Sequence, residues 1–389
     1  LKDSLCFQAV FFVVLSENTT FGLLCLKDNI GAYLVIGSSS CYNKNTISGS
    51  HVEIKNRQEE KDMIRFATVG TGWIVGEFLR GAKEVPEVEY VACYSRTRER
   101  GELFAREWGA QKVYTDLEQM AQDDAIDAVY IASPNSLHYE QSKLFLQNGK
   151  HVICEKPITV EPEQLEELQQ LAQQKQLIYL EALIGVYLPQ MQVLKGAVER
   201  LGRVYLARFD FSQYSSKYPA YLRGEVPNIF NPKMATGGLM DLGIYCLYPA
   251  IILFGVPDKV DAHARFLDTG ADASGCVTLQ YADKTVVLTY SKTAQGVIGS
   301  EIQGEDGVIR IPRISNLVDM TFTPLNGEER LLTGPEEKYR QMSYEMAFFK
   351  RFIEEPNRYR PYYQYVSNLA LNVSRVMKQA REKAGIFFE

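Results

Sequence analysis

The chain has 389 residues, of which 46% are hydrophobic and 23% charged, a globular composition that excludes disordered and collagen-like chains. Its formal net charge of −6 argues against a broad nucleic-acid interface, because phosphate binding needs a clustered basic face. Seven cysteines without a C-x-x-C pair and only four histidines exclude a zinc framework and favour the cytoplasm, so no metal site is expected. At about 150 residues per domain, this length predicts two domains.

Residues 1–62 differ from the remainder of the chain. Short apolar runs lie between patches rich in Asn, Ser and Thr, and no helical or strand periodicity is sustained. The longest apolar run, Phe7–Leu15, is shorter than the ~20 residues that span a membrane. No small-x-small cleavage site follows it, so a secretory signal fits poorly. We interpret 1–62 as a misassigned or non-native extension, with Met63 as the natural start, and expect no membrane association.

A strand, a glycine turn and a helix follow Met63. The apolar segment 64–69 predicts the strand, and 74–82 predicts the helix. Glycines at such a turn let backbone amides approach a pyrophosphate at the helix N-terminus, although a plain tight turn would also explain them. The third glycine of a dinucleotide fingerprint is displaced, since Val75 precedes Gly76. The candidate cofactor-binding residues here are Gly70, Thr71, Gly72, Trp73 and Ile74.

A second predicted strand, 88–94, ends where a dinucleotide fold carries the residue that reads the ribose. NAD-preferring sites place Asp or Glu there, whereas this chain has Ser95 and Arg96. An arginine and a hydroxyl can bind the 2′-phosphate of NADP, which a carboxylate would repel. We therefore expect NADP, with NAD as the alternative if Arg96 belongs only to the solvated first turn of the next helix.

Strands and helices then alternate along the chain. Strands are predicted at 126–131, 150–154 and 177–180, and helices at 97–108, 137–148 and 161–174. This alternation predicts a doubly wound parallel sheet, a Rossmann domain over 63–184, which binds its ligand at the carboxyl ends of the strands. Further cofactor-binding candidates at that edge are Ser133, Pro134, Asn135, His138, Glu155 and Lys156.

The apolar helix predicted over 237–254 carries a carboxylate, Asp241, and a phenol, Tyr245. These two side chains are four residues apart and share one helical face. Burying them costs free energy unless they find partners, so Tyr245 is either a hydrogen-bonded core residue or a proton-transfer group. In the second interpretation a nearby ammonium lowers its pKa, and Lys156 is the obvious ammonium.

Short segments separated by Gly, Asp and Asn turns follow residue 185. They predict a domain over 185–389 with an open, mostly antiparallel sheet, closed by helices at 336–354 and 364–384. A broad sheet with a free apolar face commonly pairs with a second copy, so a homodimer or homotetramer is expected through this sheet. The predicted strands are 204–212, 260–267, 275–281, 285–291, 300–303, 307–311 and 318–322.

Taken together, these motifs resemble the glucose–fructose oxidoreductase / inositol dehydrogenase / MocA family over residues 63–389. The resemblance rests on four segments in this order: 70–74, 132–138, 149–157 and 231–245, the last ending in Asp-Leu-Gly-Ile-Tyr. Many members carry histidine at the position of Tyr245. The tyrosine form is similar to the branch that contains glucose–fructose oxidoreductase and dimeric dihydrodiol dehydrogenase, which is largely NADP-linked.

The resemblance implies a dehydrogenase that interconverts a secondary alcohol and a ketone on a sugar, polyol or cyclic diol. It implies Lys156 beside the nicotinamide and the reacting carbon, Tyr245 as acid and base, and Asp241 as a support for the substrate. The family's Met-x-Arg-Phe/Tyr-His-Pro run is replaced by 184–189, without Arg or His, and we expect this change at the substrate pocket. The alternative is a non-catalytic NADP-binding sensor with the same fold, because fold alone does not fix function.

Overall fold

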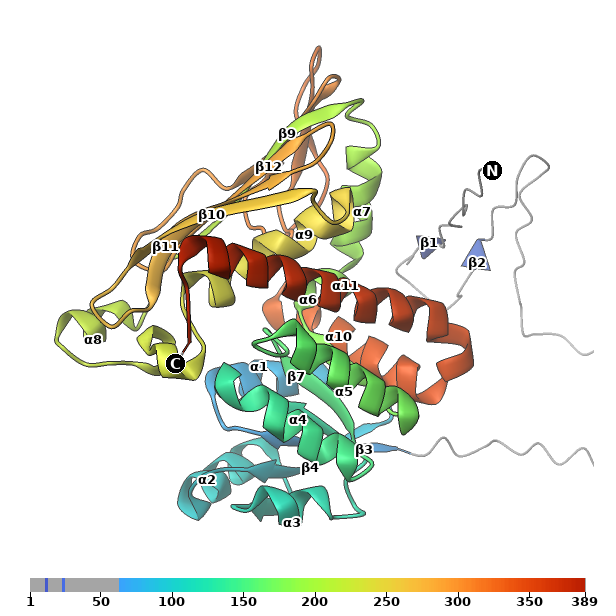
Figure 1. Ribbon diagram of the computed structural model, residues 1–389. Coiled ribbons are helices and arrows are strands. Elements are labelled where there is room, and N and C mark those ends of the chain that lie inside the picture. The colour runs from blue at the N-terminus through green and yellow to red at the C-terminus, as the bar shows by residue number, and fades with distance from the viewer. Residues whose placement is uncertain (1–10, 13–22, 25–62, 389) are drawn as a thin grey trace, which may run out of the picture. The chain divides into compact units, whose positions relative to one another are not determined.

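The computed structural model describes residues 11–12, 23–24 and 63–388. The first two pairs are the short strands β1 (Phe11–Phe12) and β2 (Leu23–Leu24), which pair antiparallel. The other residues of 1–62 lie outside the described part of the chain, so the interpretation of this segment as an extension stays a prediction. From residue 63 onward the chain forms one unit built on two sheets (Figure 1).

The first sheet confirms the predicted Rossmann topology. Its six strands are all parallel and lie in the order β5-β4-β3-β6-β7-β8. Successive side chains point to opposite faces, so Phe66 and Tyr130 belong to one core while Ala67 and Val129 belong to another. Both faces are therefore covered, which is why the strands are continuous apolar runs. The strands are β3 (Ile64–Val69), β4 (Val88–Tyr94), β5 (Lys112–Tyr114), β6 (Ala128–Ile131), β7 (His151–Glu155) and β8 (Tyr179–Ala182).

Helices cover each face of this sheet. The face of Phe66 packs on α1 (Trp73–Ala82) and α2 (Arg98–Trp108). The opposite face packs on α3 (Leu117–Ala121), α4 (His138–Gln147) and α5 (Pro162–Gln174). The strand β5 and the helix α3 were not predicted, because each is only a few residues long.

The second sheet has eight strands in the order β10-β11-β12-β9-β13-β14-β15-β16. Only the β12–β9 pair is parallel, so the prediction of an open, mostly antiparallel sheet is confirmed. Along β10, buried Val260 and Ala262 alternate with exposed Lys259 and Asp261, as in a sheet with one covered face. The strands are β9 (Val204–Ser212), β10 (Lys259–Phe266), β11 (Asp272–Gln280), β12 (Thr285–Ser291), β13 (Ser300–Gly304), β14 (Gly307–Ile311), β15 (Thr321–Pro324) and β16 (Arg330–Leu331).

The helices α9 (Ile244–Phe254), α10 (Lys338–Glu354) and α11 (Pro356–Ala384) pack around the two sheets. Helix α11 contacts β10 and α9 on one side and α5 and β8 on the other, and Figure 1 shows it between the two layers. Helix α10 packs against α1. The remaining elements are η1 (Asn135–Leu137), α6 (Ile184–Tyr187), α7 (Pro189–Val198), α8 (Tyr218–Leu222), η2 (Asn228–Phe230), η3 (Pro232–Met234) and η4 (Leu239–Gly243).

Two predicted elements differ from the structure in an informative way. The strand expected over 318–322 begins only at Thr321, because Leu317 and Asp319 adopt positive φ values of 56° and 57°, which interrupt an extended chain. The last helix begins at Pro356 rather than at residue 364, with a proline at its first position and Pro361 still within its early turns.

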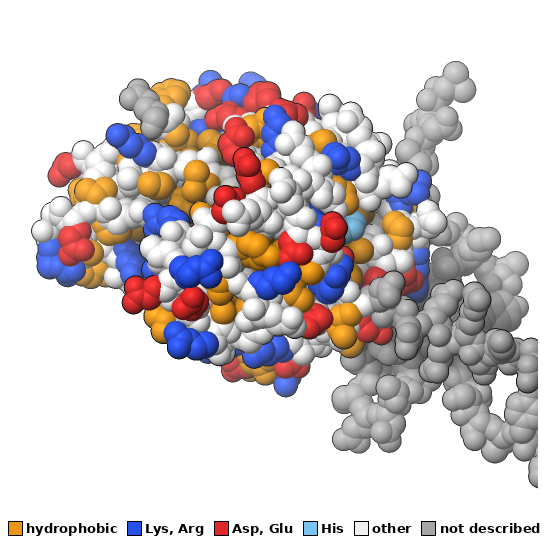
Figure 2. Space-filling view, turned by 90° about the horizontal axis from the view of Figure 1, so that it is seen from below, with side chains coloured by type: hydrophobic (Ala, Val, Ile, Leu, Met, Phe, Trp, Pro, Cys, Tyr) orange, Lys and Arg blue, Asp and Glu red, His pale blue; other side chains and the backbone are white. Residues whose placement is uncertain are grey.

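The stretch Pro232–Phe254 is long and apolar enough to cross a membrane by length and composition. Of its most apolar window, 72% is buried inside the protein, which is the behaviour of a core helix. On the face drawn in Figure 2, basic and acidic side chains alternate and no single-sign field extends across the surface.

Candidate active site

The carboxyl ends of β3, β6 and β7 lie next to one another in the first sheet, so the loops that follow them share one edge. The loop after β3 is the glycine turn. Gly70 has a φ of +115°, and a Cβ there would lie 2.9 Å from the carbonyl oxygen of Ala132. A side chain is therefore excluded at Gly70 by both its conformation and its neighbour.

The turn fits a dinucleotide pyrophosphate. A Cβ on Gly72 would meet no atom within 4 Å, so the space above it is open. Gly72 is the N-cap of α1 and supplies no side-chain cap, and within the described residues no hydrogen bond engages the amides of Trp73 and Ile74. Unpaired amides at a helix N-terminus bind anions. The displaced Gly76 instead allows α1 and α2 to pack closely, since a Cβ there would lie 2.9 Å from the Trp108 ring of α2.

The end of β4 carries the two candidates for reading the ribose. Ser95 is buried and its N–H donates to the carbonyl of Tyr114, whereas Arg96 is exposed and forms no ion pair within the described chain. Arg100, which the sequence analysis missed, lies over the glycine turn, where its Nε donates to Thr71 Oγ1 at 2.8 Å. This edge therefore carries two guanidinium groups. Arg100 is held by Thr71, and Arg96 has no ion-pair partner among the described residues.

The loop after β6 contacts the second domain. Asn135 Nδ2 donates to the carbonyl of Ala235 at 2.8 Å, and Ser133 Oγ donates to Gln141 Oε1 at 2.6 Å. Pro134 precedes η1 and is half-buried. Asn135 is thus placed as a link between the domains as well as at the predicted ligand edge.

His138 is completely buried, and its two ring nitrogens lie 2.8 Å from the carbonyl of Pro157 and 2.9 Å from that of Ser133. The imidazole therefore joins the loops after β6 and β7. Burial lowers its pKa, the two carbonyls raise it only in part, and Lys156 lowers it further. The cofactor contact expected of His138 stays a prediction.

Glu155 and Lys156 follow β7 and point to different partners. Tyr130, stacked on Phe78 with ring centroids 3.8 Å apart, donates a 2.5 Å hydrogen bond to Glu155 Oε1. Burial raises the pKa of Glu155, against the opposing effects of Tyr130 and Lys156. Lys156 Nζ reaches across to the second domain, where it donates to Asp241 Oδ1 at 2.7 Å and to the Asp241 carbonyl at 2.8 Å.

Asp241 lies between two ammonium groups. Its Oδ1 accepts from Lys156 and its Oδ2 from Lys292, a residue directly after β12 that the sequence analysis missed. Burial would raise the pKa of Asp241, but the two lysines outweigh it and lower the pKa, so the carboxylate is ionised. Burial opposes the charge on Lys156, but Asp241 and Tyr245 raise its pKa, and it remains protonated.

Tyr245 completes the cluster. Lys156 Nζ lies 4.8 Å from the centroid of its ring, and Phe211 packs edge-on against it with centroids 5.4 Å apart. No group in the described part of the chain hydrogen-bonds to the phenol oxygen, which leaves it free for a ligand. The expected lowering of its pKa is wrong in sign: Lys156 does lower it, but burial outweighs that effect and the pKa is raised.

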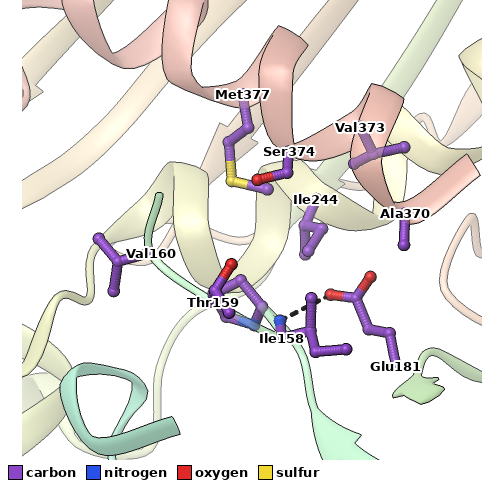
Figure 3. Close-up of a pocket in the computed structure, with 10 residues that line it drawn as sticks. Ile158, Thr159, Val160, Glu181, Ile244, Ala370, Val373, Ser374 and Met377 are labelled. Atoms are coloured by element: carbon purple, nitrogen blue, oxygen red, sulfur yellow. Dashed lines mark hydrogen bonds between the residues drawn. The ribbon is translucent and has the colours of Figure 1, made fainter. Parts of the chain in front are cut away.

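A second buried carboxyl ties the lysine loop to the tyrosine helix. Glu181 accepts a hydrogen bond from the Ile158 N–H at 2.8 Å and another from the hydroxyl of Tyr248, one helical turn beyond Tyr245. Figure 3 shows Glu181 and its bond to Ile158 beside a small cavity. Burial raises the pKa of Glu181 to about 7. Its presence inside an apolar strand was the only sequence signal for this role.

The segment that departs from the family's pattern is buried over most of its length. Residues 184–188 are all buried in the hydrophobic core, and the Tyr187 hydroxyl donates to the carbonyl of Glu181. The place of this segment at the substrate pocket stays a prediction. Within residues 63–388 there is no group of three metal-ligating side chains.

The comparisons with known proteins agree with this geometry. The sequence model of an oxidoreductase family with an NAD-binding Rossmann fold matches residues 64–183, and that of the GFO/IDH/MocA C-terminal domain matches 192–310. A Rossmann domain with this second sheet defines a two-domain, nicotinamide-dependent oxidoreductase. The chain belongs to the Gfo/Idh/MocA family, as the sequence resemblance implied.

Two similar proteins align over nearly their full length. The oxidoreductase YgjR of Escherichia coli K12 is 39% identical over 84% of this chain and 98% of its own. IolU of Bacillus subtilis, a scyllo-inositol 2-dehydrogenase (NADP+), is 38% identical over the same shares. Among solved structures, the 3-ketoreductase KijD10 of Actinomadura kijaniata, in complex with NADP, superposes with a TM-score of 0.73 at 21% identity, covering 83% of this chain and 98% of that one. This last likeness supports the fold.

Proposed function

We propose that the protein is an NADP-dependent dehydrogenase that interconverts a secondary alcohol and a ketone on a cyclic polyol, sugar or cyclic diol. The observation that carries this proposal is the cluster of Lys156, Asp241 and Tyr245. It lies at the carboxyl edge of the first sheet, the edge that also carries the glycine turn. Two relatives of this chain support the substrate class. IolU is named for its activity on an inositol, and another relative is a trans-1,2-dihydrobenzene-1,2-diol dehydrogenase.

The residues of this cluster account for the proton chemistry. A bound nicotinamide supplies the acceptor or donor for hydride. During oxidation the hydroxyl proton passes to Tyr245 Oη in its deprotonated, phenolate form, and during reduction the neutral phenol donates its proton to the carbonyl oxygen. Lys156 carries a positive charge beside that oxygen and stabilises the negative charge that develops on it. Because the raised pKa keeps Tyr245 protonated near neutral pH, the resting site is prepared for reduction, and oxidation accelerates as pH rises.

The preference for NADP over NAD rests on the charge at the end of β4. Arg96 is exposed where an NAD-specific site would carry a carboxylate, and Arg100 brings a second guanidinium to the same edge. We place the enzyme in the cytoplasm, since the four described cysteines are free. We further propose that its outer sheet face, with exposed Tyr205 and Leu206 on β9, pairs with a second copy as a homodimer or within a homotetramer.

The test uses protein that begins at Met63. Reduced-nicotinamide absorbance is followed with NADP or NAD against a panel of inositols, sugars and cyclic diols. Turnover with NADP is expected, and turnover with NAD alone would reject the cofactor assignment. Tight NADP binding without turnover of any alcohol or ketone would instead favour the non-catalytic sensor.

A further inference from the structure

Lys292 is a buried charge beside Asp241 that this mechanism does not use. It is 1% exposed, and its ammonium has a single hydrogen-bond partner among the described residues, Asp241 Oδ2. Its backbone is fixed on both sides, because its N–H donates to the Ala273 carbonyl at 2.8 Å and its carbonyl accepts from the Ser215 N–H at 2.9 Å. A buried ammonium costs free energy, so its location opposite Lys156 requires a compensating interaction, which Asp241 supplies.

We propose that Lys292 is a positioning residue that holds Asp241 from behind, so that Lys156 keeps an uncompensated positive charge beside Tyr245. This inference rests on the proposed function. Two ammonium groups share one carboxylate, which leaves one net positive charge in the cluster. Without Lys292, Lys156 and Asp241 would form a one-to-one pair, and the field that stabilises a phenolate or an alkoxide would weaken.

Other charges also face the two groups. Glu155 from the end of β7, Asp241 from its own helical segment and Glu345 from α10 all oppose ionisation of Tyr245, and Lys156 alone among its main neighbours favours it. The favourable field therefore depends on one ammonium. A change that neutralises the charge of Lys156 more completely is expected to raise the pKa of Tyr245.

Lys292 itself faces Asp241, Lys156 and Asp272. Burial, together with Lys156, outweighs the two carboxyls and lowers the pKa of Lys292. Replacement by methionine keeps the length and apolar volume of the side chain. It leaves Asp241 paired with Lys156, so no buried charge loses its last partner.

The experiment measures the pH dependence of kcat for alcohol oxidation, together with NADP affinity, in the wild type and in Lys292→Met, Lys292→Arg and Lys259→Gln. Lys259 is exposed on β10 and controls for the loss of one positive charge. In Lys292→Met we expect the ionisation that limits oxidation to move upward by about one pH unit. NADP affinity should stay within about twofold of the wild type, and Lys259→Gln should leave both quantities unchanged.

Lys292→Arg keeps the positive charge behind Asp241, so the ionisation that limits oxidation and kcat should both stay closer to the wild type than in Lys292→Met. This variant decides the matter if Lys292→Met does not fold. Loss of kcat in Lys292→Met with an unshifted pH profile would overturn the inference, and so would an upward shift in Lys292→Arg as large as the one expected in Lys292→Met. Absence of turnover in the wild type would reject the proposed function instead, so the two failures are distinguishable.

Discussion

Lys156 and Tyr245 meet across the boundary between the two domains, with the ammonium 4.8 Å from the centroid of the phenol ring. One residue comes from the loop after a parallel strand and the other from the apolar helix beneath the second sheet. The proposed catalysis by this pair therefore depends on both domains. The cluster is fixed by the bonds from Lys156 to the side chain and carbonyl of Asp241.

Replacement of Tyr245 by phenylalanine removes the oxygen and retains the ring that packs on Phe211. We expect kcat to fall about 10²- to 10⁴-fold, the range typical for loss of a general acid or base, while NADP affinity is preserved. Steady-state rates and nucleotide titration check this result. Tyr365→Phe, on the exposed surface of α11, is the matched control. Substantial turnover in Tyr245→Phe would remove the phenol from the proton-transfer role.

Two glycines of the same turn should respond differently to alanine. At Gly70, the φ of +115° and the nearby carbonyl of Ala132 make a Cβ unfavourable, and Gly70→Ala should lower the free energy of unfolding by about 1–3 kcal/mol. Gly72 has an extended backbone with a φ of −81° and open space around it, so Gly72→Ala should fold normally.

In Gly72→Ala the added methyl group would nevertheless occupy the space that a pyrophosphate needs. We expect Gly72→Ala to weaken NADP binding by about tenfold or more at unchanged stability. Thermal unfolding and nucleotide titration of both variants test the pair. Wild-type NADP affinity in Gly72→Ala would show that the nucleotide does not use this turn.

Local patterns were sufficient to predict most of the fold. The glycine turn and its flanking strand and helix were found where the structure has them, because the periodicity and the turn chemistry agree there. The strand near 318 was misplaced because nothing in its composition reveals the positive φ values of Leu317 and Asp319. Those conformations depend on distant packing, including the bond from Thr333 Oγ1 to the Leu317 carbonyl.

The candidate site was predictable only where its residues lie in a motif. Lys156, Asp241 and Tyr245 come from two recognisable segments, and the structure brings them together. Lys292 gave no signal, because a lysine after a strand is usually exposed and its partner is 51 residues away. The sign of the Tyr245 pKa was also missed, since burial is a property of the whole fold.

The exposed Arg96 provides a direct test of coenzyme choice. We expect Arg96→Ala to weaken NADP binding by about tenfold and to leave NAD binding unchanged, because only NADP carries the 2′-phosphate that a guanidinium would bind. Arg98→Ala, at the first position of α2, is the control, since this side chain lies 4.0 Å from Glu102 within its own helix. Titration of each variant with both nucleotides gives the ratio. Equal losses for NADP and NAD would assign Arg96 to the solvated turn of the helix.

Glu181 makes stability depend on pH in a predictable direction. Its pKa is raised by burial from 4.5 to about 7, so the folded protein binds a proton that the unfolded chain releases. The stabilisation is complete below pH 4.5 and is lost as pH rises through 7. From this shift we estimate a loss of about 3 kcal/mol over that interval.

Glu181→Gln cannot ionise, so this contribution disappears and stability should decline less between pH 5 and 8 than in the wild type. Glu155, Glu345 and Asp272 are shifted in the same direction and keep part of the decline in both proteins. Denaturant unfolding at a series of pH values gives the difference, and Glu140→Gln, on the exposed surface of α4, is the control. If the wild type and Glu181→Gln lose stability in parallel, Glu181 is ionised in the folded protein and its bonds to Ile158 and Tyr248 hold a carboxylate.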